Sequence, residues 1–255
     1  MRAGIAVPQA LRAFFDAHHK LALAFSGGVD SAYLLYAATA CGCDVRAFYA
    51  QSAFQPAFER ADAARMSEAL GAAMTVVPVD VLAVDAVRAN PADRCYHCKR
   101  ALFSALAAAA RDAGYDAIMD GTNASDDAGD RPGMRELAEM GVLSPLRQCG
   151  VTKDQVRAYS REAGLFTWDK PAYACLATRV PAGTPIDEAT LARVEGAEAA
   201  LFGLGYTDFR VRFFHDAARL QLPADQLARA VEGRNAIRAA LEPWFETVLL
   251  ELKER

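Results

Sequence analysis

One stretch near the start of the chain decides the fold. An apolar run, LALAF at residues 21–25, is followed directly by SGGVDS at residues 26–31 and then by a helical pattern over residues 31–41. Adjacent glycines allow positive φ angles and let backbone N–H groups come close to a ligand. A helix that begins at such a turn offers unpaired N–H groups and the positive end of its dipole to an anion. The stretch therefore predicts a strand, a phosphate-binding loop and a helix.

The residues of this loop limit its chemistry. It is not the GxxxxGK[ST] loop and carries no lysine, so the γ-phosphate chemistry of that motif is not indicated. Ser26 and Ser31 add hydroxyl donors. Asp30 would repel a bare phosphate, so it makes sense beside a metal ion or as a helix cap. The alternative interpretation is a glycine-rich turn with an aspartate N-cap.

Strand and helix patterns alternate through the first two thirds of the chain. Further strands are expected at 45–50, 75–79 and 117–120, and further helices at 54–70, 95–113 and 152–163. This alternation predicts an α/β fold, a Rossmann-like parallel sheet with helices on both faces. After Lys170 the pattern changes to a loop-rich stretch and a small α+β unit, with helices at 187–204 and 223–241 and strands at 207–214, 219–222 and 246–252. We expect two domains, residues 1–181 and 182–255.

Composition excludes several classes of protein. The 255 residues are 53% apolar and carry a net charge of −4, which excludes global disorder and argues against a general nucleic-acid binder. No window reaches the roughly 18 consecutive apolar residues of a membrane helix. The first twenty residues lack the pattern of a secretory leader. We expect a cytoplasmic protein without membrane or nucleic-acid partners.

The six cysteines are too sparse for a disulfide scaffold. Cys95 and Cys98 form a CxxC pair at the start of an expected helix, which in a reducing compartment indicates metal, cluster or redox chemistry. Cys41 and Cys43 lie where a helix meets a strand, and packing explains them best. Cys149 has no partner signal.

SGGVDS resembles the PP-loop of the adenine nucleotide α-hydrolase superfamily, whose members bind ATP, adenylate an acceptor and release pyrophosphate. The resemblance implies an ATP and Mg²⁺ site on the loop and at a strand end further along the chain. The implied nucleotide-binding residues are Ser26, Gly27, Gly28, Val29, Asp30, Ser31, Gly121 and Thr122.

A narrower resemblance covers nearly the whole chain. The segments NPADRCYHCK (90–99), DGTNA (120–124), RPG (131–133), SPL (144–146) and KPAYACLATR (170–179) are together similar to the LarE family. Its members are ATP-dependent sulfur transferases that build the nickel-pincer cofactor. The resemblance implies that a carboxylate of a pyridinium dicarboxylate mononucleotide is adenylated, attacked by sulfur and released as a thiocarboxylate.

Cys175 is the expected point of sulfur delivery, and the sequence leaves its chemistry open. In one interpretation Cys95, Cys98 and Cys175 bind a [4Fe-4S] cluster whose open iron carries a sulfide from an external donor. In the other, Cys175 forms a thioester and gives up its own sulfur, leaving dehydroalanine. A structural zinc site that adds His97 is the third possibility, although His97 lies awkwardly between its neighbours.

Basic residues near the end of the chain suggest how the substrate is held. Arg210 and Arg212 alternate along a strand and face one way, and the family resemblance assigns such a pair to the mononucleotide phosphate. Arg179 is a candidate for the same substrate or for AMP, and Arg94 is a weaker one. Glu195 and Glu198 are expected to bind a cation, to pair with Arg210 and Arg212 or to lie on a solvated face.

Other functions compete with this interpretation. A tRNA thiolase or an ammonia-dependent amide synthetase would share the PP-loop, but a tRNA enzyme should show a basic stripe and an amide synthetase does not need three cysteines. A non-enzymatic adenine-nucleotide binding module would not need Asp30 beside Mg²⁺. We also expect a homo-oligomer assembled through the C-terminal unit.

Overall fold

The computed structural model describes residues 7–126 and 132–253. It divides into two compact units. The first comprises Met1–Ser52, Ala57–Val81 and Cys95–Lys170, and the second comprises Ala53–Pro56, Leu82–Arg94 and Pro171–Arg255.

The first unit is built on a four-stranded parallel sheet. Its strands are β1 (Lys20–Ala24), β2 (Asp44–Gln51), β3 (Met74–Pro78) and β4 (Ile118–Met119), in the order β3-β2-β1-β4. All three strand pairs are parallel. The predicted Rossmann-like α/β fold is confirmed, and each predicted strand lies within a few residues of its expected position.

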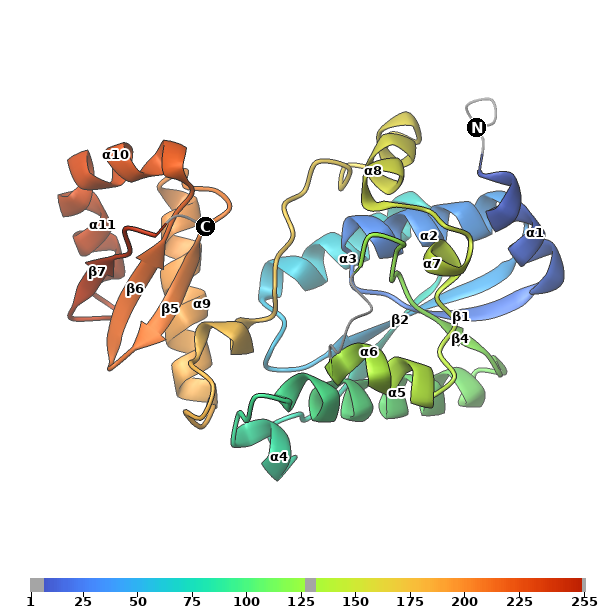
Figure 1. The fold of residues 1–255 in the computed structure, drawn as a ribbon, viewed down its shortest axis with the longest axis horizontal. Coiled ribbons are helices and arrows are strands. Elements are labelled where there is room, and N and C mark those ends of the chain that lie inside the picture. Colours follow the sequence, from blue (N-terminus) through green and yellow to red (C-terminus); the bar gives the residue numbers. More distant parts are fainter. Residues whose placement is uncertain (1–6, 127–131, 254–255) are drawn as a thin grey trace. The chain divides into compact units, whose positions relative to one another are not determined.

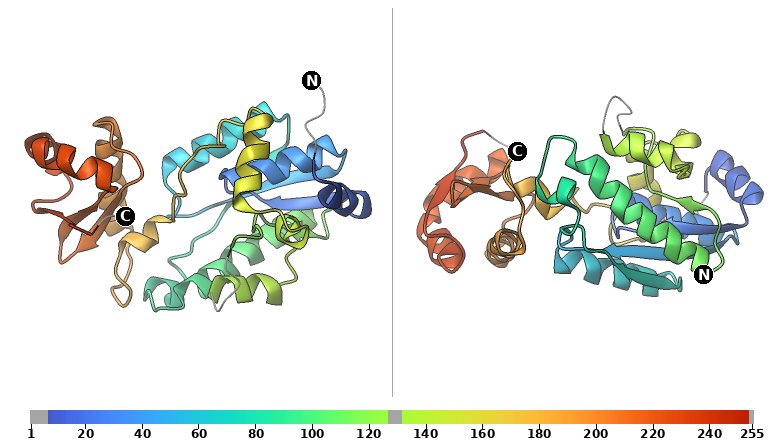
Figure 2. Two further views of the ribbon diagram at one scale, coloured as in Figure 1. Left: turned by 45° about the horizontal axis from the view of Figure 1, so that its top comes forward. Right: turned by 90° about the horizontal axis from the view of Figure 1, so that it is seen from below.

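Helices cover both faces of this sheet, as Figure 1 shows. Leu21 and Leu23 of β1 join one core with helix α2 (Val29–Ala40), whereas Ala22 joins a second core with helix α5 (Arg94–Asp112). Successive strand residues point to opposite faces, so an entirely apolar strand needs cover on both sides. The left view of Figure 2 shows the same succession of helix, sheet and helix.

The remaining helices of the first unit are α1, α3, α6, α7 and α8. Their bounds are Gln9–Ala17, Ala57–Ala69, Pro132–Glu139, Pro145–Gln148 and Lys153–Glu162. Helix α8 begins as predicted, because Thr152 forms a capping box with Gln155. The sequence pattern does not predict helices α1, α6 and α7. Arg131, part of one family segment, lies outside the described residues.

The second unit has a three-stranded sheet of β5 (Arg210–Phe214), β6 (Ala217–Gln221) and β7 (Val248–Leu250), with β6 in the middle. β5 pairs antiparallel and β7 parallel to β6. Helix α9 (Glu188–Gly203) begins at the N-cap Asp187. The short helices α4 (Asp85–Arg88) and η1 (Leu176–Arg179) also belong to this unit.

The single helix expected over 223–241 is wrong. The structure has two helices there, α10 (Ala224–Glu232) and α11 (Arg234–Leu241), which meet at Gly233. The ψ angle of Gly233 is 9°, outside the helical range, and glycine has a weak helix propensity. Helical periodicity continues in the sequence on both sides of Gly233, so the pattern does not indicate the break.

The division into units also differs from the predicted boundary between 181 and 182. The second unit already begins at Pro171 and includes the segment around α4. The Asn90 side chain donates to the carbonyls of Pro181 and Thr184 at 2.8 and 3.1 Å, and Ile186 N–H donates to the Arg88 carbonyl. These contacts join segments that are distant in the sequence, so a pattern of neighbouring residues does not predict them.

Among the residues that the structure describes, no helix is long and apolar enough to cross a membrane.

Candidate functional site

The loop after β1 is held in shape by its own serines. Ser26 Oγ and Ser31 Oγ lie 3.1 Å apart, and Ser31 Oγ donates to the Gly28 carbonyl at 3.1 Å. Gly27 has a φ of 72°, and a Cβ there would lie 3.0 Å from the Ala63 backbone. Glycine is therefore required at this position by both backbone conformation and space.

The loop delivers the N-terminus of α2 to the end of the sheet. Gly28 is the N-cap and has no side chain to cap the first N–H groups of the helix. These groups and the helix dipole form an anion site. This loop and helix start have the geometry expected from SGGVDS. They lie where β1 and β4 are neighbours, the point at which the strand order changes direction. Ligands commonly bind at this point of an α/β sheet.

The segment after β4 packs tightly against this helix start. A Cβ on Gly121 would lie 2.9 Å from the Ser31 backbone nitrogen. Asp120 is buried and accepts from the hydroxyls of Thr122 and Ser144 at 2.5 and 2.7 Å. The sequence prediction named Gly121 and Thr122; the structure brings Gly121 beside the loop, and Thr122 bonds to Asp120. Asp120 and Ser144, which it did not name as site residues, fix this segment.

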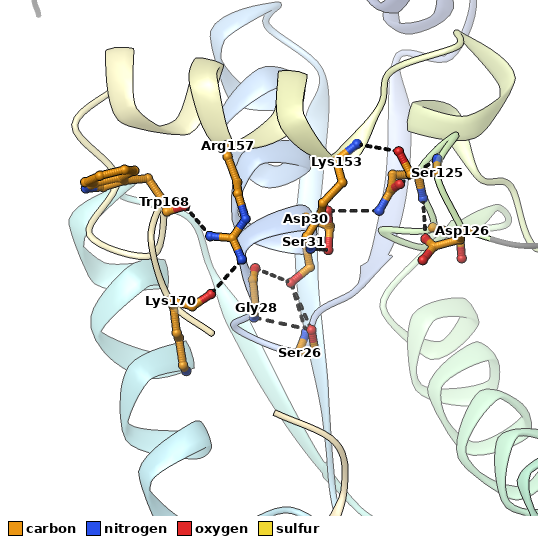
Figure 3. A network of polar contacts seen from close by, with 12 residues as sticks. Ser26, Gly28, Asp30, Ser31, Ser125, Asp126, Lys153, Arg157, Trp168 and Lys170 are labelled. Atoms are coloured by element: carbon orange, nitrogen blue, oxygen red, sulfur yellow. Dashed lines mark hydrogen bonds and ion pairs between the residues drawn. The ribbon is translucent and has the colours of Figure 1, made fainter. Parts of the chain in front are cut away.

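Asp30 faces two residues that the sequence prediction missed. Its Oδ2 lies 2.5 Å from Lys153 Nζ (Figure 3). Its Oδ1 accepts from Asn123 Nδ2 at 3.2 Å. The side chains of Lys153 and Asp30 are 31% and 23% exposed. Lys153 is the first residue of α8, far along the chain, and its only sequence signal was the start of a helix.

Helix α8 also holds the chain segment that leaves the first unit. Arg157 donates to the carbonyls of Trp168 and Lys170 at 2.6 and 3.0 Å (Figure 3). Lys170 Nζ in turn lies 2.8 Å from Asp62 of α3. One helix therefore contacts the phosphate loop at its first residue and the 168–170 segment one turn later.

The CxxC pair opens α5 in the first unit. Cys95 is exposed and Cys98 is buried, on the first turn of the helix. Residues three apart lie on the same side of a helix, and its N-terminus favours thiolates. Burial lowers the pKa of Lys99 beside them, although Asp120 and Cys95 oppose that shift. The described residues contain no group of three or more His, Cys, Asp or Glu side chains placed to hold a metal ion.

Three cysteines outside the CxxC pair, Cys41, Cys43 and Cys149, are packed thiols. Burial raises the pKa of Cys43 to about 11, and its Sγ donates to the His18 carbonyl. Burial likewise raises the pKa values of Cys41 and Cys149. These thiols stay protonated near neutral pH, which agrees with a packing role.

Cys175 belongs to the second unit and precedes η1. The guanidinium NH1 of Arg94 lies 3.9 Å from its Sγ. Arg94 is buried and also lies over the Phe54 ring, and the Phe54 carbonyl accepts from Leu176 N–H. The Arg94 guanidinium is therefore within hydrogen-bond distance of the Cys175 sulfur.

A buried ion pair holds the loop that carries Cys175. Arg179 and Glu198 are 1% and 2% exposed in their side chains and form paired N–H···O contacts at 2.8 and 3.1 Å. Arg179 NH1 also donates to the Ala174 carbonyl, and Tyr173 donates its hydroxyl to Glu198. Burial alone would lower the pKa of Arg179, but the hydrogen bonds and charge of Glu198 raise it.

These contacts exclude two of the alternatives expected for Glu198. Glu198 lies neither on a solvated face nor against Arg210 and Arg212, because it pairs with Arg179 and accepts from the Val211 backbone N–H. Contact of Arg179 with a substrate stays a prediction, and the contacts it makes in the structure fix the loop. Glu195 is half-buried on the same helix.

Arg210 and Arg212 lie half-buried on β5, on either side of the buried Val211. Their alternation places both on one face of the strand, as the sequence indicated. Arg212 donates to Gln221 Oε1 and to the Thr178 carbonyl, each at 3.0 Å. Both residues therefore share the second unit with Cys175 and its loop.

The parallel sheet and the SGGVDS loop at its change of strand order define an α/β protein of the PP-loop class. Comparison with known proteins narrows this class. A protein of Lactiplantibacillus plantarum named pyridinium-3,5-bisthiocarboxylic acid mononucleotide synthase is 33% identical over 236 residues, 91% of this chain and 86% of the relative. The chain belongs to the LarE family.

Two further relatives have no assigned function. An uncharacterised protein of Synechocystis sp. is 37% identical over 223 residues, 87% of this chain and 83% of the relative. An uncharacterised protein of Methanocaldococcus jannaschii is 27% identical over 173 residues, 68% of each chain. No family model matches the chain.

Proposed function

We propose that the protein is an ATP-dependent sulfur transferase acting on a pyridinium dicarboxylate mononucleotide, which it converts to a thiocarboxylate for the nickel-pincer cofactor. The observation that carries the proposal is the 33% identity to the named synthase over 91% of the chain, which includes both units. The phosphate loop and the cysteine beside Arg94 supply the two kinds of chemistry that this reaction needs.

The first half-reaction is adenylation. A substrate carboxylate oxygen attacks the α-phosphorus of ATP, the bond between that phosphorus and the α–β bridging oxygen breaks, and pyrophosphate leaves. The loop N–H groups and serines neutralise phosphate charge. Asp30 already faces a cation, the ammonium of Lys153, and a carboxylate that attracts a cation fits a place beside Mg²⁺. Gly121 and Thr122 are proposed to contact AMP.

The second half-reaction transfers sulfur. A thiolate or sulfide attacks the acyl carbon, and AMP leaves with the electrons of the broken C–O bond. Arg94 places a guanidinium donor beside the sulfur of Cys175. Arg210 and Arg212 are proposed to hold the substrate phosphate, since guanidinium groups bind phosphate through paired hydrogen bonds.

For the sulfur source we propose a [4Fe-4S] cluster on Cys95, Cys98 and Cys175. The CxxC pair on the first turn of α5 fits two of its ligands, and Cys175 is the proposed third. When bound, such a cluster supplies an iron with an open position for a sulfide from an external donor.

A sacrificial Cys175 is the second candidate. The contact with Arg94 favours it, because a positioned sulfur can attack the acyl-adenylate directly. The resulting thioester then loses its sulfur by β-elimination. The thiocarboxylate leaves with the electrons of the Cβ–S bond, a proton leaves the Cα, and dehydroalanine remains.

Adenylation is tested by following ATP with Mg²⁺ and the candidate carboxylate. We expect AMP and pyrophosphate, and we expect Asp30→Ala to abolish their formation while the far-ultraviolet circular dichroism stays unchanged. Release of ADP and orthophosphate would exclude the proposal. Nucleotide binding without any cleavage would favour the non-enzymatic binding module instead.

The sulfur source is tested on anaerobically purified protein. A cluster predicts about four irons per chain, loss of iron in Cys95→Ala, Cys98→Ala and Cys175→Ala, and more than one turnover when sulfide is supplied. Sacrifice of Cys175 predicts activity without iron, one turnover, and a mass loss of about 34 Da, the mass of H₂S lost from the thiol side chain.

The remaining rivals differ in their acceptors. A tRNA thiolase would modify tRNA, and an amide synthetase would consume ammonia without any dependence on the cysteines. Parallel assays with tRNA, ammonia and the mononucleotide separate these activities. We further propose a homo-oligomer assembled through the second unit, which light scattering on the purified protein tests.

A further inference from the structure

We infer that Asn90 is a positioning residue, whose side-chain amide holds Arg94 and Cys175 opposite one another. The inference deepens the proposed delivery of sulfur at Cys175 and rests on it. Asn90 acts through the two chain segments that carry the guanidinium and the sulfur. Both segments, residues 82–94 and the residues from Pro171 onward, belong to the second unit.

The backbone conformation of Asn90 does not by itself require asparagine. The residue follows the short helix α4, and its φ of 53° lies in the left-handed region. Glycine adopts this conformation at the lowest cost and is the usual residue after a helix, whereas asparagine is found there less often. Asn90 is nevertheless buried, with 3% of its surface exposed. The contacts of its side chain therefore explain the asparagine better than the turn does.

The amide of Asn90 binds the residues that follow η1. Its Nδ2 donates to the carbonyls of Pro181 and Thr184 at 2.8 and 3.1 Å, and more weakly to that of Val180 at 3.4 Å. Gly183 N–H returns a hydrogen bond to the Asn90 carbonyl at 2.8 Å. A side-chain amide has two N–H donors, so these carbonyls take its full donor capacity. Together these contacts form the Asn90 clasp.

The Asn90 clasp lies close in the chain to both reacting partners. Helix η1 begins directly after Cys175 and leads into residues 180–184, so a shift of these residues moves the helix and the sulfur with it. On the other segment, Arg94 N–H donates to the Pro91 carbonyl at 3.0 Å, so one hydrogen-bonded turn separates Arg94 from Asn90. The clasp therefore limits the distance between the guanidinium NH1 and the sulfur, which is 3.9 Å.

The start of η1 is held by a separate contact. Leu176 N–H donates to the Phe54 carbonyl at 2.9 Å, and the Arg94 guanidinium lies 5.5 Å from the centre of the Phe54 ring. Phe54 at one end of η1 and Asn90 at the other therefore orient the helix toward Arg94. A misplacement of about 1 Å can slow a reaction a hundredfold, so a residue that fixes this arrangement affects sulfur delivery without contacting the sulfur.

The test compares Asn90→Gly, Arg94→Met and the double variant in the full-length protein. Glycine keeps the left-handed backbone and removes only the amide. We expect Asn90→Gly to slow the alkylation of Cys175 by iodoacetamide several-fold, as Arg94→Met does. The double variant should react no more slowly than Arg94→Met, because both changes remove the same contact. Gln226→Ala is the matched control, since it removes an amide that binds Thr207 elsewhere in the second unit, and its rate should equal that of the wild type.

A merely structural role gives different results. Faster alkylation of Cys175 in Asn90→Gly would show a loosened loop with a more accessible sulfur, and a wild-type rate would show no influence on Cys175. Either result would overturn the inference, as would a double variant in which the two single effects multiply. If Asn90→Gly failed to fold, Asn90→Asp would be measured in its place, because it keeps the size of the side chain and replaces the N–H donors with an oxygen.

The two half-reactions separate this inference from the proposed function. In Asn90→Gly we expect sulfur transfer to fall about tenfold or more, with AMP and pyrophosphate formed at the wild-type rate. An equal loss of both would show a general disturbance and contradict a positioning role. Wild-type protein that forms no thiocarboxylate would overturn the proposed function, whereas the alkylation rates would still decide whether Asn90 positions Arg94 and Cys175.

Discussion

Arg94 and Cys175 are 81 positions apart in the sequence, yet the guanidinium NH1 lies 3.9 Å from the sulfur within one compact unit. The contact brings a positive charge to the cysteine that the sequence had marked for sulfur delivery. It depends on the short segment 82–94, which folds with the C-terminal part of the chain rather than with the residues around it.

Loss of this contact should make Cys175 less reactive. We expect Arg94→Met to slow the alkylation of Cys175 by iodoacetamide several-fold at neutral pH, because the sulfur loses the neighbouring guanidinium that holds it in place. Peptide mass spectrometry measures the rate for each cysteine. Arg88→Met is the matched control, because its side chain pairs only with the exposed Asp85 in the contacts described here. Equal rates in both variants would show that Arg94 does not act on the sulfur.

Breaking the buried pair beneath this loop should destabilise the protein. Glu198→Gln leaves the Arg179 guanidinium buried without its counter-charge, which costs about 3–5 kcal/mol for such pairs. Urea unfolding measures the change. The double variant Arg179→Met with Glu198→Leu should recover part of the stability, because it removes both charges together. A loss below about 1 kcal/mol, the range of exposed pairs, would contradict this account.

Gly121 should be intolerant of any side chain. A Cβ there would lie 2.9 Å from the Ser31 nitrogen, so Gly121→Ala must displace the start of α2 from the strand end. We expect at least a tenfold loss of Mg²⁺-ATP affinity with the fold retained, measured by calorimetry. Gly203→Ala, at a helical glycine with open space around it, should bind normally. Normal binding by both variants would mean that the segment adapts without cost.

The arginines of β5 should affect the substrate more than the nucleotide. We expect Arg210→Ala and Arg212→Ala each to weaken mononucleotide binding about ten- to a hundredfold, with ATP affinity nearly unchanged. Competition binding with the two ligands measures the ratio. Arg234→Ala, on the exposed start of α11, is the control. If the substrate affinity stayed constant in both variants, the strand face would be structural only.

The sequence by itself determined the features that local physics encodes. The apolar runs, the glycine pair and the cap at Thr152 each act over a few residues, so they determined the strands, the phosphate loop and the start of α8. The family resemblance, which the comparisons confirm, also depended on short motifs. The break at Gly233 was missed because helical periodicity continued on both sides of it.

Only the tertiary structure decided which distant side chains meet. Lys153 reaches Asp30, Arg94 reaches Cys175, and Glu198 takes Arg179 rather than the arginines of β5. These pairs depend on the packing of α8 against α2 and of the 82–94 segment against the C-terminal residues. The type and spacing of residues indicate which chemistry is possible. The partner of a buried charge, however, depends on which element the fold brings within hydrogen-bond distance.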